Sequence, residues 1–396
     1  MSAQLALKRN LTKIYIAHIA IGFSLIAPIF VLYFQQVGLT LQEIFILQSI
    51  NATAILLFEV PSGFLSDKIG RKKTLLLSII SIEIAFAIYI LLPNFWAFVV
   101  ADIFYALAIS LYSGTFSALV YETLKEHNQE DDFKKVWGNI IFYTLLGTSG
   151  AALLSGFLAT FSLRLPFIVN FFTYMVAFLA LLFLHEPRST EDKKSQKELL
   201  KAVKKTFFNG SILKWVVLFS AIIYIFAQGA FYFYQPYLKL SGIELVYFGM
   251  IFASFNLVAS IGSKYAYKIE KALGSLGVFI VIIFLVSASL IAMGLYSGIF
   301  SVIFIYAQQF VRMLKAIVVD DLINKESSSE YRATMLSIES LIRKALIALF
   351  LPLLGYLGDS IGIKTTLALM GVATLVFTLP IVIILLKNKS ILFEKR

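Results

Sequence analysis

The sequence predicts an all-helical membrane protein with twelve transmembrane helices in two pseudo-symmetric six-helix bundles. Three observations predict this fold: the composition, apolar runs at near-regular spacing, and one polar interruption near the middle of the chain. Of the 396 residues, 59% are hydrophobic and 14% are charged, and the mean hydropathy is +0.86. Soluble domains average roughly 45–50% apolar and about 25% charged residues. The composition therefore excludes an ordinary soluble domain.

The apolar runs are long enough to cross a bilayer. A membrane-spanning helix needs about 20 mainly apolar residues, because the hydrocarbon core is about 30 Å thick. The runs are continuous rather than alternating, which favours helices over a β-barrel. The predicted spans are residues 12–35, 41–66, 73–92, 94–123, 132–160, 164–184, 211–238, 243–268, 273–294, 296–324, 330–358 and 362–387.

The distribution of basic residues predicts the orientation in the membrane. If the N-terminus is cytoplasmic, most of the 34 Lys and Arg residues fall in cytoplasmic segments. The exceptions on the opposite side are Arg164, Lys239 and Lys364. Cytoplasmic loops carry such an excess of positive charge, which accounts for the net charge of +11 without nucleic-acid binding. We expect a multi-pass protein of the bacterial inner (plasma) membrane, with both termini cytoplasmic.

A polar segment after the sixth predicted span divides the chain. Residues 185–210 are rich in charge, unlike the runs on either side. We predict an N-terminal six-helix bundle over residues 1–186, a cytoplasmic linker over 187–210 and a C-terminal six-helix bundle over 211–396. Within the linker, residues 197–208 fit either a basic amphipathic helix on the membrane surface or a plain flexible connection.

The two halves resemble each other in sequence. Residues 119–124 (Leu-Val-Tyr-Glu-Thr-Leu) are similar to 318–323 (Val-Val-Asp-Asp-Leu-Ile), and residues 156–158 are similar to 355–357. Both pairs are separated by about 199 residues. A shared separation indicates an ancient duplication, which is common among membrane transport proteins.

One motif lies between the second and third spans. Residues 63–73 read Gly-Phe-Leu-Ser-Asp-Lys-Ile-Gly-Arg-Lys-Lys. This segment resembles the signature loop of the major facilitator superfamily, and the span count, the central loop, the repeat and Glu186-Pro187 after the sixth span agree with that family. The matching positions are Gly63, Leu65, Asp67, Lys68, Gly70, Arg71 and Lys72.

Physical chemistry supports the same motif. Gly70 can take the left-handed backbone conformation that a sharp reversal needs, and Gly63 removes a side chain where helices could approach closely. The resemblance implies that Asp67 pairs with the start of the eleventh helix, after residues 327–330, in the outward-facing state. It also implies that Arg71 pairs with an acid near the end of the fourth span, for which we select Glu122.

A gating role for these charges competes with a simpler interpretation. The basic residues, Lys68 and Lys72 among them, could act only as anchors that hold the loop in the cytoplasm. In the second half, residues 263–271 occupy the equivalent place, but the aspartate and the turn glycine are absent. We therefore expect an asymmetric gate.

Charged and polar groups inside the spans are the candidate proton and substrate sites. A charge at mid-membrane costs at least about 2.5–3.5 kcal/mol, so such residues are functional candidates. Each buried acid could carry a proton or form a fixed ion pair, and a fixed pair is favoured for Glu339 and Arg343, which lie four residues apart. The candidates are His18, Glu59, Glu83, Asp102, Gln228, Asn256, Gln308, Arg312, Glu339 and Arg343.

Aromatic residues gather at the end of the seventh span. Residues 231–237 read Phe-Tyr-Phe-Tyr-Gln-Pro-Tyr. They fit either an interfacial aromatic belt or an aromatic wall for an apolar substrate.

The sequence offers no sign of cofactor chemistry. Cysteine is absent and the three histidines are far apart, so a metal site is not predicted. No phosphate-binding Gly-x-x-x-x-Gly-Lys-Ser/Thr loop occurs, so we expect the proton gradient to be the energy source. The sequence shows no Ser/His/Asp grouping of the kind that catalysis needs. We therefore do not predict an enzyme, and this includes an enzyme that acts on lipid.

The resemblance implies a transporter that moves a small molecule by alternating access. We expect proton-coupled efflux of drug-like or metabolite molecules, although span five lacks a proline from 136 to 163, unlike the drug exporters of the superfamily. The alternatives are an importer of a nutrient or siderophore and, more remotely, a transport-silent receptor or scaffold. The expected partners are the substrate and the lipid bilayer, with no nucleic acid and a monomeric chain.

Overall fold

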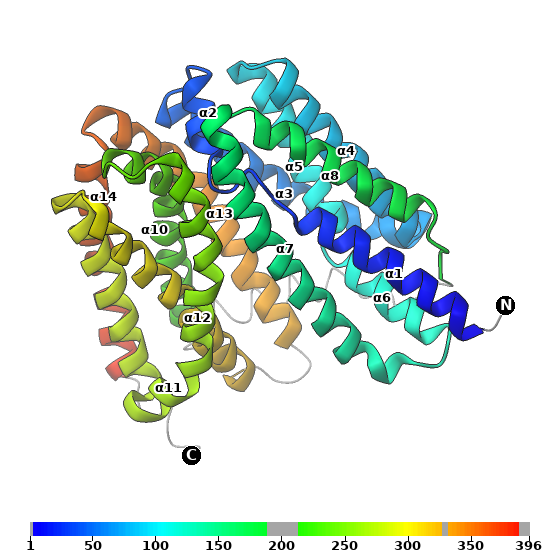
Figure 1. Cartoon of the computed structure of the whole chain (residues 1–396). Coiled ribbons are helices and arrows are strands. Elements are labelled where there is room, and N and C mark those ends of the chain that lie inside the picture. The colour runs from blue at the N-terminus through cyan, green and yellow to red at the C-terminus, as the bar shows by residue number, and fades with distance from the viewer. Residues whose placement is uncertain (1–2, 188–212, 327–331, 388–396) are drawn as a thin grey trace. The chain divides into compact units, whose positions relative to one another are not determined.

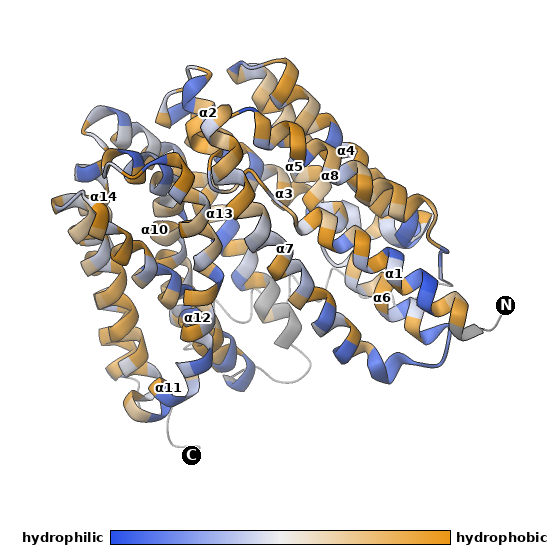
Figure 2. Ribbon diagram, in the orientation of Figure 1, coloured by the Kyte–Doolittle hydropathy of each residue, from blue (hydrophilic) through white to orange (hydrophobic). Residues whose placement is uncertain are grey.

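A computed structural model describes residues 3–187, 213–326 and 332–387. Every regular element in these ranges is helical. Ten of the helices are long and apolar enough to cross a membrane. Figure 2 shows hydrophobic residues along most of their length and hydrophilic residues gathered at the connection between α6 (Thr115–Lys125) and α7 (Phe133–Phe161). The predicted all-helical membrane fold is confirmed.

Two features reconcile ten spanning helices with the twelve predicted spans. Helix α11 (Leu245–Leu295) contains two predicted spans, which meet at Gly274 in a non-helical conformation. The first predicted span, 12–35, is instead divided between α1 (Ala3–Gly22) and the short α2 (Phe30–Gln36). These two helices are separate ribbons in Figure 1.

The chain divides into two compact units. The first comprises Met1–Lys193 with Glu244–Ala253, and the second comprises Lys194–Ile243 with Ser254–Arg396. The start of α11 groups with the first unit because its backbone packs closely on α7: a Cβ added at Gly156 would lie 2.7 Å from the amide nitrogen of Gly249.

Helices α1, α4 and α5 organise the first unit. Helix α4 packs on α5 and α8, α3 packs on α5, and α1 packs on α7 and α8. Besides α1, α2, α6 and α7, the unit contains α3 (Leu41–Ile69), α4 (Arg71–Leu91), α5 (Phe95–Tyr112), the 3-10 turn η1 (Glu130–Asp132) and α8 (Leu165–Leu182).

The break after α1 is stabilised by side chains from neighbouring helices. The backbone amide of Leu25 donates to Asn170 Oδ1 at 2.8 Å, and Asn170 Nδ2 donates to the carbonyl of Phe23 at 3.3 Å. Thr148 Oγ1 donates to the carbonyl of Gly22 at 2.7 Å. Lipid supplies no hydrogen bonds, so an interrupted helix needs such partners. Pro28, which lacks an amide donor, explains why the helix does not continue.

Helix α10 is the centre of the second unit. It packs on α12, α13 and α14. The unit is built from α10 (Leu213–Leu240), most of α11, the 3-10 turn η2 (Ile299–Ser301), α12 (Val302–Glu326), α13 (Arg332–Ser360) and α14 (Ile363–Lys387). Most of the inward face of α10 is buried, including polar residues such as Gln235. Polar groups on a buried membrane helix need partners, so the polar residues of α10 are candidates for a binding site.

Candidate functional site

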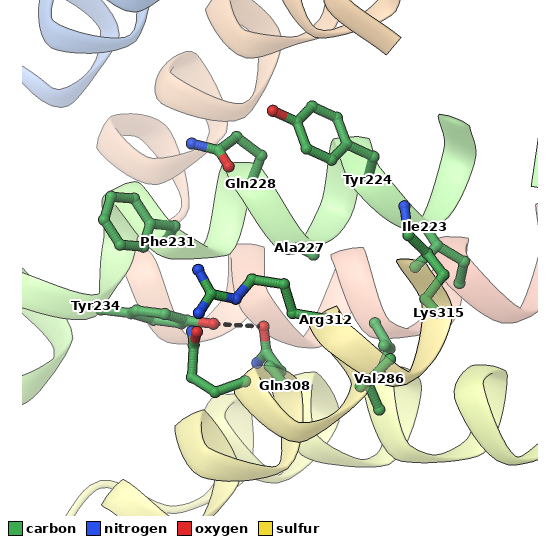
Figure 3. A pocket seen from close by; sticks show the side chains of 12 residues that line it. Ile223, Tyr224, Ala227, Gln228, Phe231, Tyr234, Val286, Gln308, Arg312 and Lys315 are labelled. Carbon is green, nitrogen blue, oxygen red and sulfur yellow. Dashed lines mark hydrogen bonds between the residues drawn. The ribbon is translucent and has the colours of Figure 1, made fainter. Parts of the chain in front are cut away.

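The second unit contains a pocket of about 200 Å³ between α10, α11 and α12. Figure 3 shows the side chains that line it. Helix α10 contributes Ile223, Tyr224, Ala227, Gln228, Phe231 and Tyr234, α11 contributes Val286, and α12 contributes Gln308, Gln309, Val311, Arg312 and Lys315.

Helical periodicity brings these residues together. On α10 the lining positions recur every three or four residues from Tyr224 to Tyr234, and on α12 they recur likewise from Gln308 to Lys315. Residues at this spacing share one face of a helix. Gln228, Gln308 and Arg312, three of the candidates from the sequence, therefore line one pocket.

The tyrosine at one end of the pocket is fixed by hydrogen bonding. Tyr234 Oη donates to Gln308 Oε1 at 2.8 Å, and Gln308 Nε2 lies 3.4 Å from the sulfur of Met293. Tyr234, Phe233 and Tyr237 are at most 1% exposed. An interfacial belt is therefore the wrong interpretation for these three, because they pack inside the unit instead of facing the membrane surface.

Arg312 is the most accessible charge in the pocket. Its side chain crosses the pocket from α12 toward Gln228 and Phe231 on α10 (Figure 3). Its nearest polar contact is long, at 3.5 Å from Nη2 to Asn256 Oδ1. In the described ranges no acid lies within 4.0 Å of the guanidinium. Arg312 thus presents a positive charge with donors available to a ligand.

A buried polar network adjoins the pocket. Lys315 Nζ donates to the carbonyl of Ser220 at 3.3 Å and to its Oγ at 3.2 Å. Ser220 Oγ donates to Glu339 Oε1 at 2.6 Å, and Arg343 Nε lies 2.8 Å from Glu339 Oε2. The pairing of Glu339 with Arg343 expected from the sequence is therefore present. The Tyr224 ring lies 5.5 Å from Lys315 Nζ and 4.9 Å from the Arg343 guanidinium carbon.

The loop motif of the first unit forms a second polar cluster. Arg71 donates to Asp67 Oδ1 at 2.8 Å, to Ser66 Oγ at 2.8 Å and to Glu122 Oε1 at 3.1 Å. The partner selected from the sequence, Glu122, is therefore in contact with Arg71. The other expected partner of Asp67, at residues 327–330, lies outside the described residues.

The glycines of the motif have different surroundings. Gly70 adopts φ 95°, as the turn requires, and the amide of Lys72 donates to Glu186 Oε1 beside it at 3.1 Å. A Cβ at Gly70 would lie 2.1 Å from that oxygen. Gly63 has no neighbour within 4 Å of a Cβ position. The expectation that a neighbouring helix approaches Gly63 is wrong for this conformation, because Gly63 lies on an open face of α3.

The second half also has a glycine at the equivalent turn. Gly274 adopts φ 70° and ψ 163°, close to the φ 95° and ψ 159° of Gly70. The prediction that this glycine is absent was wrong because the window 263–271 ends three residues too early. The polar contacts across the two turns are alike in direction: Ser275 Oγ, after Gly274, donates to Glu270 Oε1, before it, at 2.6 Å, as Arg71 donates across Gly70 to Asp67. In the first half Arg71 follows the glycine and Ser66 precedes it.

The candidate acids of the first unit have few partners. Tyr89 Oη donates to Asp102 Oδ1 at 2.6 Å, whereas Asp102 Oδ2 and both Glu83 carboxylate oxygens are buried without a hydrogen bond in the described structure. Glu59 is half-buried on α3. His18 Nδ1 lies 2.8 Å from Thr144 Oγ1. Over the described residues, no group of three His, Asp or Glu side chains could hold a metal ion.

Sequence reasoning missed part of the pocket. Tyr224 of the pocket and Ser220 of the adjoining network were not selected, although their spacing of four residues on α10 places them on one face. Charge and amide content pointed to Gln228, Gln308 and Arg312, but a tyrosine among 19 tyrosines carries little signal by itself.

Comparisons with known proteins agree with this architecture. The family model described as Major Facilitator Superfamily matches residues 16–338. The uncharacterized MFS-type transporter YxaM of Bacillus subtilis is 23% identical over 81% of this chain and 82% of its own. The quinolone resistance protein NorA of Staphylococcus aureus is 22% identical over 51% of this chain and 52% of its own.

Solved structures share the fold at low identity. The nucleoside transporter NupG superposes with a TM-score of 0.81 at 15% identity, covering 95% of this chain and 98% of its own. A POT family transporter in complex with a thioalcohol conjugated peptide superposes with a TM-score of 0.69 at 14% identity, covering 96% of each chain. The family match spans most of the chain, so the protein belongs to the major facilitator superfamily of membrane transporters.

Proposed function

We propose that this transporter exports small drug-like or metabolite molecules by alternating access, driven by the proton gradient. The pocket of the second unit is the observation that carries the proposal. It places amide, cationic and aromatic side chains around an opening in an otherwise apolar bundle. Small-molecule sites are typically such mostly apolar cavities with a few placed polar groups. The similarity to a quinolone resistance protein favours export over uptake.

Proton coupling is proposed for the buried acids of the first unit. Asp102 is 3% exposed and has a neutral donor, Tyr89, as its side-chain partner. Among the described residues no cation lies within 4.0 Å of Asp102 or Glu83. A membrane-embedded acid without a fixed counterion can take up and release a proton as its access to water changes.

Gating is proposed for the cluster around Arg71. This side chain joins α4 to α3 through Asp67 and to α6 through Glu122. Because three helices share one guanidinium, a movement of any of them changes the bonds of the other two. In this proposal the protein acts as a monomer in the bacterial inner membrane with both termini cytoplasmic.

Transport by purified protein in proteoliposomes tests the function. A pH-sensitive dye is enclosed, a pH gradient is imposed, and candidate solutes are added from a panel of aromatic and heterocyclic molecules. We expect that adding at least one of the solutes makes protons move down their gradient while the solute moves against its own concentration gradient. An ionophore that collapses the gradient should abolish solute accumulation, and protein-free liposomes serve as the control.

The direction of coupling separates the alternatives. Solute and proton moving in opposite directions supports export, whereas movement in the same direction would instead identify an importer. Solutes that bind without any movement of solute or protons would contradict transport and favour a receptor role.

A further inference from the structure

We propose that the pocket of the second unit selects small aromatic acids, with the carboxylate of the substrate bound by Arg312. This inference rests on the proposed transport function and names the substrate class. It starts from the charges that line the pocket: Arg312 and Lys315 are basic, and no Asp or Glu is among the described lining residues.

The two cations have different surroundings. Lys315 is 7% exposed, and its ammonium donates to Ser220, which in turn donates to Glu339. The ammonium of Lys315 therefore has hydrogen-bond acceptors within a buried network whose acid, Glu339, pairs with Arg343. Among the residues that the structure describes, the one hydrogen bond of Arg312 is the long contact with Asn256, a neutral amide. Arg312 is therefore the exposed cation of the pocket with donors left for a ligand, whereas Lys315 is buried and its ammonium already donates to Ser220.

An anion satisfies this arrangement better than other ligands. A guanidinium presents its donors in a planar fork that matches a carboxylate with two parallel hydrogen bonds. A cationic ligand would meet Arg312 without an acid to offset the repulsion. A neutral ligand would leave a charge at membrane depth uncompensated, which is costly. The charge of the pocket therefore favours an acid.

The walls and the size of the pocket define the rest of the ligand. Phe231 and Tyr234 offer aromatic rings beside Arg312, and Tyr224 lies further along α10 (Figure 3). Rings prefer offset or edge contacts with other rings. The volume of about 200 Å³ is below the range of roughly 300–1,000 Å³ usual for drug-sized ligands. The geometry therefore fits a body of one or two rings.

Binding to the purified full-length protein in lipid nanodiscs tests the inference. The probes are a panel of one- and two-ring aromatic carboxylates such as 2-naphthoate, each with its methyl ester and its aminomethyl analogue. Binding to the folded state raises the unfolding temperature, by more for a tighter ligand at the same concentration, and equilibrium dialysis gives the dissociation constant. We expect acids among the tightest binders, with esters and amines at least about tenfold weaker, as for the loss of a charge-assisted hydrogen bond.

Two substitutions at one position separate charge from shape. Arg312→Gln should weaken binding of the acid about tenfold or more and leave the ester unchanged, whereas Arg312→Lys should retain most of the preference for the acid. Unchanged ester binding also shows that the variant is folded. Lys239→Gln, an exposed basic position at the end of the same α10, is the matched control and should change neither ligand.

The outcomes distinguish the inference from the function on which it rests. A preference for acids that survives Arg312→Gln, tight binders drawn mainly from esters or amines, or no bound acid at all would overturn the inference. If neutral solutes are transported and Arg312→Gln leaves their rate unchanged, the inference fails while transport stands. If acids bind through Arg312 but are never moved across the membrane, the transport function fails while the anion site stands.

Discussion

Gly70 and Gly274 adopt similar positive-φ conformations at equivalent turns in the two halves, yet the residue that follows the glycine is a cation, Arg71, in the first turn and a neutral serine in the second. In the first half Arg71, directly after Gly70, donates to Asp67 and Ser66 before it and to Glu122 of α6. In the second half Ser275, directly after Gly274, donates to Glu270 before it. The backbone conformation and an acid before the glycine occur in both turns, whereas the arginine of the first turn is replaced by a serine in the second. The two turns therefore differ in side chains and not in backbone, which is the kind of asymmetry that the proposed gate would need.

Alanine substitutions at these two glycines should differ in cost. Each introduces a side chain at positive φ, which costs roughly 1–2 kcal/mol. Gly70→Ala should cost more than Gly274→Ala, because its Cβ would also collide with Glu186 Oε1 at 2.1 Å, whereas no atom lies within 4 Å at Gly274. The unfolding temperature of the purified variants measures this difference. Gly63→Ala, in an open helical position, is the control, and equal losses at positions 70 and 274 would contradict the prediction.

Replacing Arg71 should lower the free energy of unfolding, because the buried carboxylate of Glu122 loses its ion-pair partner. The Glu122 side chain is 6% exposed, and breaking a buried pair by removing one partner costs about 3–5 kcal/mol. Glu122→Gln in the Arg71→Ala background should restore part of that loss, because no buried charge then remains. A double-mutant cycle on the free energy of unfolding measures the coupling. Additive effects of the two substitutions would show that the observed contact contributes little.

Asp102→Asn should separate proton movement from solute binding. The amide can still accept from Tyr89 but cannot exchange a proton, so the dye signal in proteoliposomes should fall by at least about tenfold while solute affinity stays within about twofold. Asp131→Asn, an exposed acid in η1, is the matched control and should leave both measurements unchanged. Full gradient-driven transport by Asp102→Asn would exclude Asp102 as the carrier and direct attention to Glu83 and Glu59.

Asn170→Leu should destabilise the first unit. It removes the acceptor of the Leu25 amide and the donor to the Phe23 carbonyl, and a buried backbone group left without a partner costs about 1–3 kcal/mol. We expect a fall in unfolding temperature that Asn170→Gln recovers only partly, because the longer side chain shifts the amide. Asn94→Ala, an exposed helix cap on α5, is the control with an expected cost of about 1 kcal/mol. An unchanged unfolding temperature in Asn170→Leu would show that other groups replace the hydrogen bonds to Leu25 and Phe23.

The spans and the motif contacts were predictable because they depend on local chemistry. Long apolar runs must be helical in lipid, and a cation near the end of one span finds an acid at the matching depth of another, as Arg71 finds Glu122. The break at residues 23–29 was less visible, because its stabilising partner Asn170 is distant in sequence and the run itself is apolar. Gly274 was missed because the two halves differ in length between the aligned segments.

The pocket could be predicted only in part. Gln228, Gln308 and Arg312 stood out because polar groups are rare in membrane spans. Which of many aromatic residues face them depends on the rotation of α10 about its axis. That rotation is set by packing against α12, α13 and α14, and no local pattern specifies it.

The interruption between α1 and α2 can act as a hinge. A change of angle between α1 and α2 breaks no backbone bond within either helix, because residues 22, 23 and 25 bond to the side chains of Thr148 and Asn170. Bending here would exchange side-chain bonds such as those to Gly22, Phe23 and Leu25, whereas bending a continuous helix would break bonds of its own backbone. Substitutions at Thr148 should therefore alter how fast the first unit changes shape more than how well it folds.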